Sequence, residues 1–228
     1  MRKFAPLALL LFMLVPLRPV AQKVDAQPGL GLPMVTFELN WRDADPHWYS
    51  VSIDSTARAG YQSEPHVAPG ETPGVTFLVK FTATTATRDK VFQLAEELNE
   101  FQNANYDAGG QVAQTGIKTL RWQDASHNFQ ASYNGSKNPK VIELTSIFQR
   151  ISITMEEGRR LADKLSFDRL DLDHELQRAE KMYNQHQLLE LQALQPTLQN
   201  IANNPGILAS SRYRARKLLA AVERAAGK

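Results

Sequence analysis

Apolar and polar residues alternate strictly in several short segments of the chain, which predicts half-buried β-strands. In the first segment, residues 35–41, every second side chain is apolar and the residues between them are polar. The same period of two recurs at residues 49–53, 77–81, 118–122 and 129–133. Because residues 54–56 and 124–126 are polar turn formers at hairpin distances, we expect neighbouring strands to pair in an antiparallel manner.

Apolar residues spaced three or four positions apart predict helices between and after these strands. Thr85 can cap a helix that runs to about Asn99, and this helix should lie across the sheet. Asn138-Pro139 is typical of a helix start, because it combines a capping side chain with a first-turn proline. The apolar spacing continues this second helix toward Leu165.

The chain after Asp171 shows no strand alternation and is rich in Leu, Gln and Ala, so it should be helical. One helix is expected near Asp171, and a second carries the leucines from Leu188 to the apolar position Ile201. Pro196 should kink or divide this second helix. A third helix follows the break at residues 204–206.

These elements predict an α+β fold, with an antiparallel sheet of five to six strands packed against helices and an all-α hairpin or small bundle after it. The expected division is a signal peptide over 1–26, a linker over 27–33, an α+β domain over 34–165 and a C-terminal helical segment over 166–228.

The N-terminus has the layout of a secretory signal peptide. Met1 to Lys3 form a cationic start, and the apolar run from Phe4 to Leu17 is shorter than a bilayer-spanning helix requires. Small or modest side chains precede Ala26, so we expect cleavage after this residue, with cleavage after Ala21 as the alternative. The expected location is therefore periplasmic or extracellular, with no integral membrane segment once the leader is removed.

Removal of the leader changes the charge of the protein. The full chain of 228 residues carries 26 basic and 24 acidic side chains, whereas residues 27–228 carry 22 and 23. The near-neutral mature chain lacks the positive field that nucleic acid binding requires, so we expect no nucleic acid partner. The absence of cysteine excludes disulfides and thiolate metal sites.

Four segments carry a resemblance to a known group of proteins. They are residues 49–54, 115–120, 133–139 and 191–204. Together they resemble uncharacterised secreted proteins of Gram-negative soil bacteria, a family of unknown function, so the resemblance implies secretion and no particular activity. The sequence departs from that pattern at Gly135, where the family has a bulky aromatic residue, and at Gly109 and Gly110, where it has a basic residue or histidine.

Asp43, Asp45 and His47 form the most suggestive short cluster, because two carboxylates and an imidazole within one link could bind a ligand or a cation. Asp45-Pro46 is also ordinary turn chemistry, and no second ligand group lies at a recognised spacing, so no metal site is predicted. Residues 171–175 form another acidic group, which a helix N-terminus explains. The basic residues after Pro205 are explained by the solvated face of a docked helix.

No serine elbow, phosphate loop or thiol nucleophile is present, so no catalytic residue or cofactor is predicted. The expected function is a secreted, non-enzymatic binding or protein-interaction module whose partner is another exported protein. The alternative is a periplasmic hydrolase whose site is assembled only in the fold. A third possibility is an inhibitor or assembly partner that makes contact through exposed strand residues 49–54 or through the tail helices.

Overall fold

The computed structural model describes residues 31–65, 75–109 and 113–226, so the expected signal peptide and most of the linker lie outside the described residues. A six-stranded sheet forms the first half of the molecule, in the order β4-β3-β2-β1-β5-β6, and every neighbouring pair is antiparallel. The strands are β1 (Met34–Asn40), β2 (Trp48–Asp54), β3 (Arg58–Glu64), β4 (Phe77–Thr82), β5 (Ile117–Gln123) and β6 (Asn128–Tyr133).

The alternation of apolar residues places one face of the sheet in the core. Phe37 pairs with Val51 on one side and with Leu120 on the other, and all three side chains are fully buried. Tyr61 continues the same row on β3, where it pairs with Val51. Because a shift by one residue would turn this whole row outward, the buried face fixes the register of the strands.

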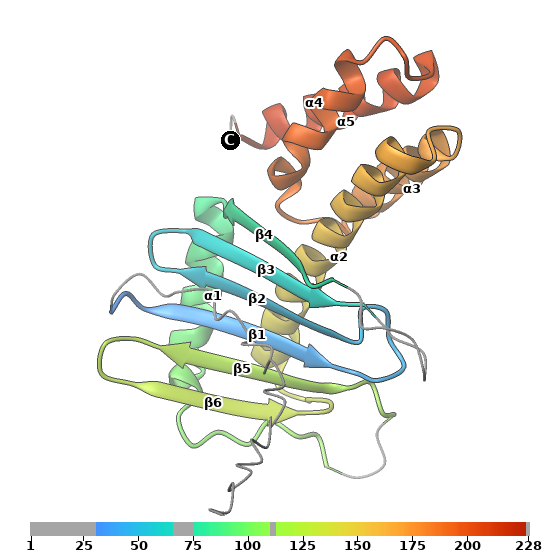
Figure 1. Ribbon diagram of the computed structural model, residues 1–228. Coiled ribbons are helices and arrows are strands. Elements are labelled where there is room, and N and C mark those ends of the chain that lie inside the picture. Colours follow the sequence, from blue (N-terminus) through green and yellow to red (C-terminus); the bar gives the residue numbers. More distant parts are fainter. Residues whose placement is uncertain (1–30, 66–74, 110–112, 227–228) are drawn as a thin grey trace, which may run out of the picture.

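Two helices cover the buried face of the sheet (Figure 1). They are α1 (Thr85–Glu97) and α2 (Pro139–Phe167). Asn138 caps α2 as expected, by accepting a hydrogen bond from the backbone N–H of Lys140. The expected cap of α1 is wrong by one residue, because Thr84 and not Thr85 accepts from the backbone N–H of Thr87. Thr84 has extended backbone angles, which a capping residue requires, whereas Thr85 already belongs to the helix.

The C-terminal residues form a separate helical lobe beyond the sheet (Figure 1). It consists of α3 (Leu172–Asn184), the short 3-10 helix η2 (Leu191–Leu194), α4 (Gln195–Asn203) and α5 (Ala209–Ala226). Pro196 stands in the first turn of α4 and separates it from η2, which confirms the expected division. Leu188 lies before η2 and outside any helix, so its assignment to one helix with Ile201 is wrong. The α+β class is confirmed, with most helices after the sheet.

α2 belongs to both halves of the molecule. Its first part contributes Val141, Leu144 and Phe148 to the core under the sheet, whereas Leu161 packs in the core of the helical lobe. α2 continues past residue 165, where the two predicted domains were divided. Of the helices in the described ranges, none is both long and apolar enough to cross a membrane.

The segment that leads into η2 connects the helical lobe to the sheet side. Glu190 accepts hydrogen bonds from the backbone N–H of Thr84 at 2.7 Å and from its hydroxyl at 2.8 Å. The backbone N–H of Leu189 donates to Thr154 Oγ1 of α2 at 3.0 Å. Glu190 therefore satisfies polar groups at the start of α1. Together with the Leu189 contact, it attaches the segment before η2 to the helices that cover the sheet.

Candidate binding pocket at the junction of sheet and helical lobe

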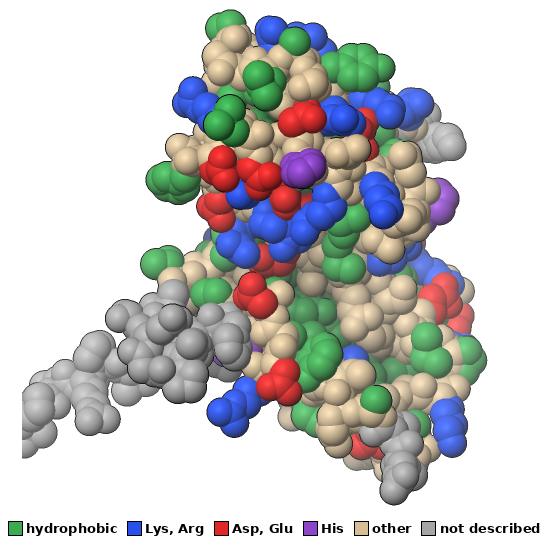
Figure 2. All heavy atoms as spheres, turned by 90° about the vertical axis from the view of Figure 1, so that its right-hand side faces the viewer, with side chains coloured by type: hydrophobic (Ala, Val, Ile, Leu, Met, Phe, Trp, Pro, Cys, Tyr) green, Lys and Arg blue, Asp and Glu red, His purple; other side chains and the backbone are tan. Residues whose placement is uncertain are grey.

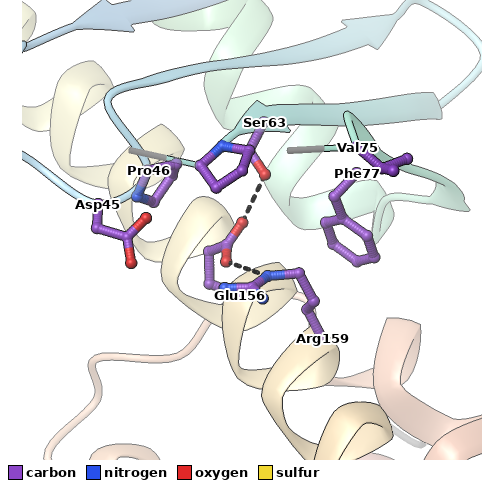
Figure 3. A pocket seen from close by; sticks show the side chains of 8 residues that line it. Asp45, Pro46, Ser63, Val75, Phe77, Glu156 and Arg159 are labelled. Atoms are coloured by element: carbon purple, nitrogen blue, oxygen red, sulfur yellow. Dashed lines mark hydrogen bonds and ion pairs between the residues drawn. The ribbon is translucent and has the colours of Figure 1, made fainter. Parts of the chain in front are cut away.

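A small pocket opens where the ends of the strands meet the middle of α2 (Figure 3). Its cavity volume is about 40 Å³, and it is partly open to solvent. Strand residues and the flanking loops form one side, and two charged residues of α2 form the other (Figure 3). The lining residues are Asp45, Pro46, Ser63, Pro65, Val75, Phe77, Glu156 and Arg159.

The carboxylate of Glu156 is held rigidly at the inner side of this pocket. Its Oε1 accepts hydrogen bonds from Tyr61 Oη at 2.8 Å and from Ser63 Oγ at 2.7 Å. Its Oε2 accepts from Arg159 Nε at 2.8 Å. Glu156 is only 4% exposed, and a buried charge is tolerated because these three donors replace the lost water.

Arg159 is the cation of the pocket, and carboxylates surround it. Its Nη1 lies 3.2 Å from Asp163 Oδ2 in addition to the contact with Glu156. Burial disfavours the charged form, but the hydrogen bond from the guanidinium to Glu156 and the charges of Glu156, Asp163 and Asp45 outweigh it and raise the pKa of Arg159. The guanidinium thus stays charged.

Burial and the nearby Glu156 charge raise the pKa of Tyr61 far above its ordinary value. Tyr61 therefore keeps its proton and acts as a hydrogen-bond donor at any physiological pH. The carboxylate thus receives two hydroxyl donors from β3 and one guanidinium donor from its own helix.

The structure places only one of the three residues singled out from the sequence in this pocket. Asp45 lines it, and Asp43, two residues earlier on the same loop, is exposed and does not. His47 Nδ1 bonds the carbonyl of Pro65 at 2.9 Å, and its Nε2 lies 3.7 Å from Glu64. Within the described ranges, no three His, Asp or Glu side chains gather as a metal site would require.

The acidic residues near 171–175 lie at the start of α3, as expected, and pair with cations of neighbouring helices. Lys164 Nζ is 2.6 Å from Asp171 Oδ2, and Arg160 Nε is 3.1 Å from Glu175 Oε1. Asp173 and Glu180 face Arg214 of α5 at 3.3 Å and 2.7 Å. Figure 2 shows acidic and basic side chains gathered side by side on one face of the molecule. Of the basic residues after Pro205, Arg214 thus holds α5 against α3.

The expectation of an exposed strand at residues 49–54 is wrong. β2 lies in the interior of the sheet between β1 and β3, and six of its seven residues are buried. The alternating pattern predicted a strand but could not predict that both its edges are paired. Large apolar residues are exposed at the end of α2 and in the turn after it, where Phe167 is 88% and Leu170 is 84% accessible.

Sequence reasoning missed most of the pocket. Ser63 and Phe77 have the spacing of ordinary strand residues, and Glu156 and Arg159 have the three-residue spacing of an ordinary ion pair along a helix. The available signal was the Glu156-Glu157 pair on a side of α2 that the apolar spacing places next to the core. No protein-family model matches the chain, and no curated protein is significantly similar to it. The resemblance to uncharacterised secreted proteins thus stays a prediction.

Proposed function

We propose that this protein is an exported, non-enzymatic interaction module, and that the junction pocket receives one side chain of another exported protein. The observation that carries this proposal is the rigid Glu156–Arg159 pair at the inner side of a pocket that is open to solvent. Each oxygen of the carboxylate already has a donor, so the pair presents fixed charge rather than a free acid or base.

The size of the pocket supports a side chain rather than a large ligand. Drug-sized ligands and cofactors occupy cavities of roughly 300–1,000 Å³. The junction pocket has a cavity volume of only about 40 Å³, with apolar walls from Pro46, Pro65 and Phe77. Such a space can take the end of one side chain while the rest of the partner lies on the surface around it.

Export is tested by fractionating the native host and sequencing the N-terminus of the mature protein. The proposal predicts a chain that begins at Gln27, or at Gln22 if cleavage follows Ala21. A cytosolic chain that retains Met1 contradicts export.

Binding is tested by affinity capture from a periplasmic extract with the wild-type chain, Asp45→Asn and the matched control Asp43→Asn. Both carboxylates are exposed and lie on one loop, but only Asp45 lines the pocket. We expect a protein that the wild-type chain and the control retain and that Asp45→Asn releases. Equal retention by all three chains would place the contact elsewhere.

The hydrolase alternative has one observation in its favour, because Ser63 Oγ donates to a carboxylate oxygen at 2.7 Å beside a pocket. Ser63 is only 2% exposed, however, so a substrate cannot reach its hydroxyl in this conformation. A fluorophosphonate probe that labels the wild-type chain but not Ser63→Ala would favour the hydrolase over the interaction module.

A further inference from the structure

β4 is an edge strand of the sheet, and only its side toward β3 is paired (Figure 1). Successive residues of an antiparallel strand direct their backbone N–H and C=O groups to alternate sides. The backbone N–H of Ala83 donates to the carbonyl of Ala57 at 2.9 Å and continues the ladder with β3. Every second residue before Ala83 therefore also faces β3, and the backbone groups of Leu78, Lys80 and Thr82 point away from the sheet.

The helical lobe closes one end of this edge and leaves the other end open. Gln192 Nε2 donates to the outward carbonyl of Thr82 at 3.1 Å. Within the described residues, no hydrogen bond reaches the outward backbone groups of Leu78 or Lys80. β4 begins at Phe77, which lines the junction pocket (Figure 3). The open stretch of the edge thus leads directly to the pocket.

The side chains of β4 do not protect this edge. Proline, bulges and charged residues commonly keep an edge strand from pairing with another chain. β4 has no proline, its six residues pair with β3 without a bulge, and Lys80 is its only charge. Leu78 is 47% exposed. The other edge strand, β6, has polar side chains at its outward positions, which are Asn128, Gln130 and Ser132. β4 is therefore the edge that is better suited to accept another strand.

We propose that an extended segment of the partner adds to β4 as a seventh strand, antiparallel like the other pairs of this sheet. This inference rests on the proposed function, and it adds the form of the segment that is bound. The backbone of the segment forms hydrogen bonds with Leu78 and Lys80, and beside Phe77 the end of one of its side chains enters the pocket. The backbone bonds then supply affinity, and the side chain in the pocket supplies specificity.

The side chains of the edge define which segment fits. Side chains directly opposite each other lie on the same face of a sheet, where opposite charges stabilise the pair and like charges destabilise it. No ion pair within the described residues includes Lys80. The segment should therefore carry an acidic residue opposite Lys80 and an apolar residue opposite Leu78. A second copy of this chain fits less well, because its own β4 contains no acidic residue.

The test is an NMR titration of the mature chain with the capped peptide Lys-Thr-Glu-Thr-Val-Thr-Lys. In the expected register its Glu lies opposite Lys80 and its Val lies opposite Leu78. The matched control has the same side chains and carries N-methyl groups on these two peptide residues. We expect amide shifts and slower hydrogen exchange at Leu78 and Lys80. The control should bind about tenfold more weakly, because two backbone hydrogen bonds are lost.

Substitutions identify the edge and its charge preference. The wild-type chain should bind this peptide about threefold more tightly than a variant peptide with Lys in place of Glu, and Lys80→Glu should reverse that preference. Leu78→Pro removes an outward N–H and should weaken binding, whereas Gln130→Pro at an outward position of β6 should not. Because Lys80 is exposed, Lys80→Glu tests the edge even if the proline variants fail to fold.

No binding of any peptide, equal binding of the N-methylated peptide, amide shifts at β6 instead of β4, or an unchanged preference in Lys80→Glu would overturn the inference. A dimer in analytical ultracentrifugation that Leu78→Pro dissociates would assign the edge to a second copy and would overturn it as well. If the captured protein still depends on Asp45 in any of these cases, the proposed function survives and only the added strand falls.

Discussion

Glu156 shows how a single residue can link structure and function in this molecule. It reaches from α2 to two hydroxyl groups of β3 and holds Arg159 at the pocket wall. A buried carboxylate without partners would destabilise the fold, whereas one with three donors fixes the strand end against the helix.

Glu156→Gln should lower the free energy of unfolding by about 2–3 kcal/mol, because hydrogen bonds to a buried charge are replaced by weaker neutral ones. The matched control is Glu143→Gln on the same helix, where an exposed pair with Lys90 at 2.9 Å is lost. That control should cost under about 1 kcal/mol. Urea denaturation measures both values, and equal losses would show that Glu156 is no more important than a surface residue.

Buried tyrosines make the fold sensitive to base. Burial raises the pKa of Tyr49 to about 12, and it also raises the pKa values of Tyr61 and Tyr133. Above about pH 10 an unfolded tyrosine releases its proton while the folded one keeps it, so stability falls as pH rises. Burial lowers the pKa of Lys118, so this group makes stability rise with pH in the alkaline range. Because Lys118 is present in both chains, its contribution cancels when a tyrosine variant is compared with the wild-type chain.

Between pH 10 and pH 12, the free energy of unfolding should therefore fall by about 2 kcal/mol less in Tyr49→Phe than in the wild-type chain. Urea denaturation at several alkaline pH values measures the slope. Parallel curves for the two chains would mean that the Tyr49 hydroxyl does not stay protonated in the fold.

At the scale of elements, the start of α1 depends on a residue that lies far along the chain. Glu190 accepts from both polar groups of Thr84, the capping residue, and Gln192 donates to the same carboxylate. The cap of a helix under the sheet is thereby completed by the helical lobe. This contact couples the two cores that share α2.

Glu190→Ala should lower the free energy of unfolding by about 2 kcal/mol, because the hydrogen bonds of a helix cap are lost in a buried place. Hydrogen exchange should quicken at the first turn of α1, near Thr87. Glu97→Ala serves as the control, since it removes an exposed pair with Lys140 and an exposed hydrogen bond from Gln93, both at 2.9 Å, at the other end of α1. Unchanged exchange at the first turn in Glu190→Ala would show that the lobe does not support this helix.

The elements that could be predicted from the sequence are those with one buried face. Alternation located five of the six strands in the described residues, all but β3, and apolar spacing located α1, α2 and α5, because burial imposes these periods directly. The turn after α1 could not be predicted, since Asn99, Glu100 and Phe101 have φ values of 53°, 54° and 67° without any glycine. Full burial of Phe101 compensates for this unfavourable backbone, and burial in a distant core leaves no local signal.

Pocket residues could be predicted only where the sequence next to them marks them as candidates for binding. Asp45 is a carboxylate in a short loop, which is why it could be selected from the sequence. Ser63, Phe77 and Glu156 come from three elements that only the folded chain brings together. No spacing rule links such positions, since the contacts depend on where α2 crosses the ends of the strands.

At the scale of the whole molecule, a long helix, α2, joins a sheet core to a helical lobe (Figure 1). The pocket lies beside the middle of this helix, where Glu156 and Arg159 line it. A partner that places a side chain there also lies beside both halves. Because the cores share α2 and the Glu190 contact, we expect the partner to meet one fixed surface.

Site-specific photo-crosslinking in the native host tests the central claim most directly. A photoreactive amino acid in place of Val75, which lines the pocket and is 91% exposed, should give an adduct with one exported protein. The same substitution at Ile142, which is 52% exposed in the first turn of α2, should give none. Asp45→Asn should abolish the adduct, and Asp43→Asn should not. An adduct of equal yield from Ile142, or one that survives Asp45→Asn, would contradict a binding site at the junction pocket.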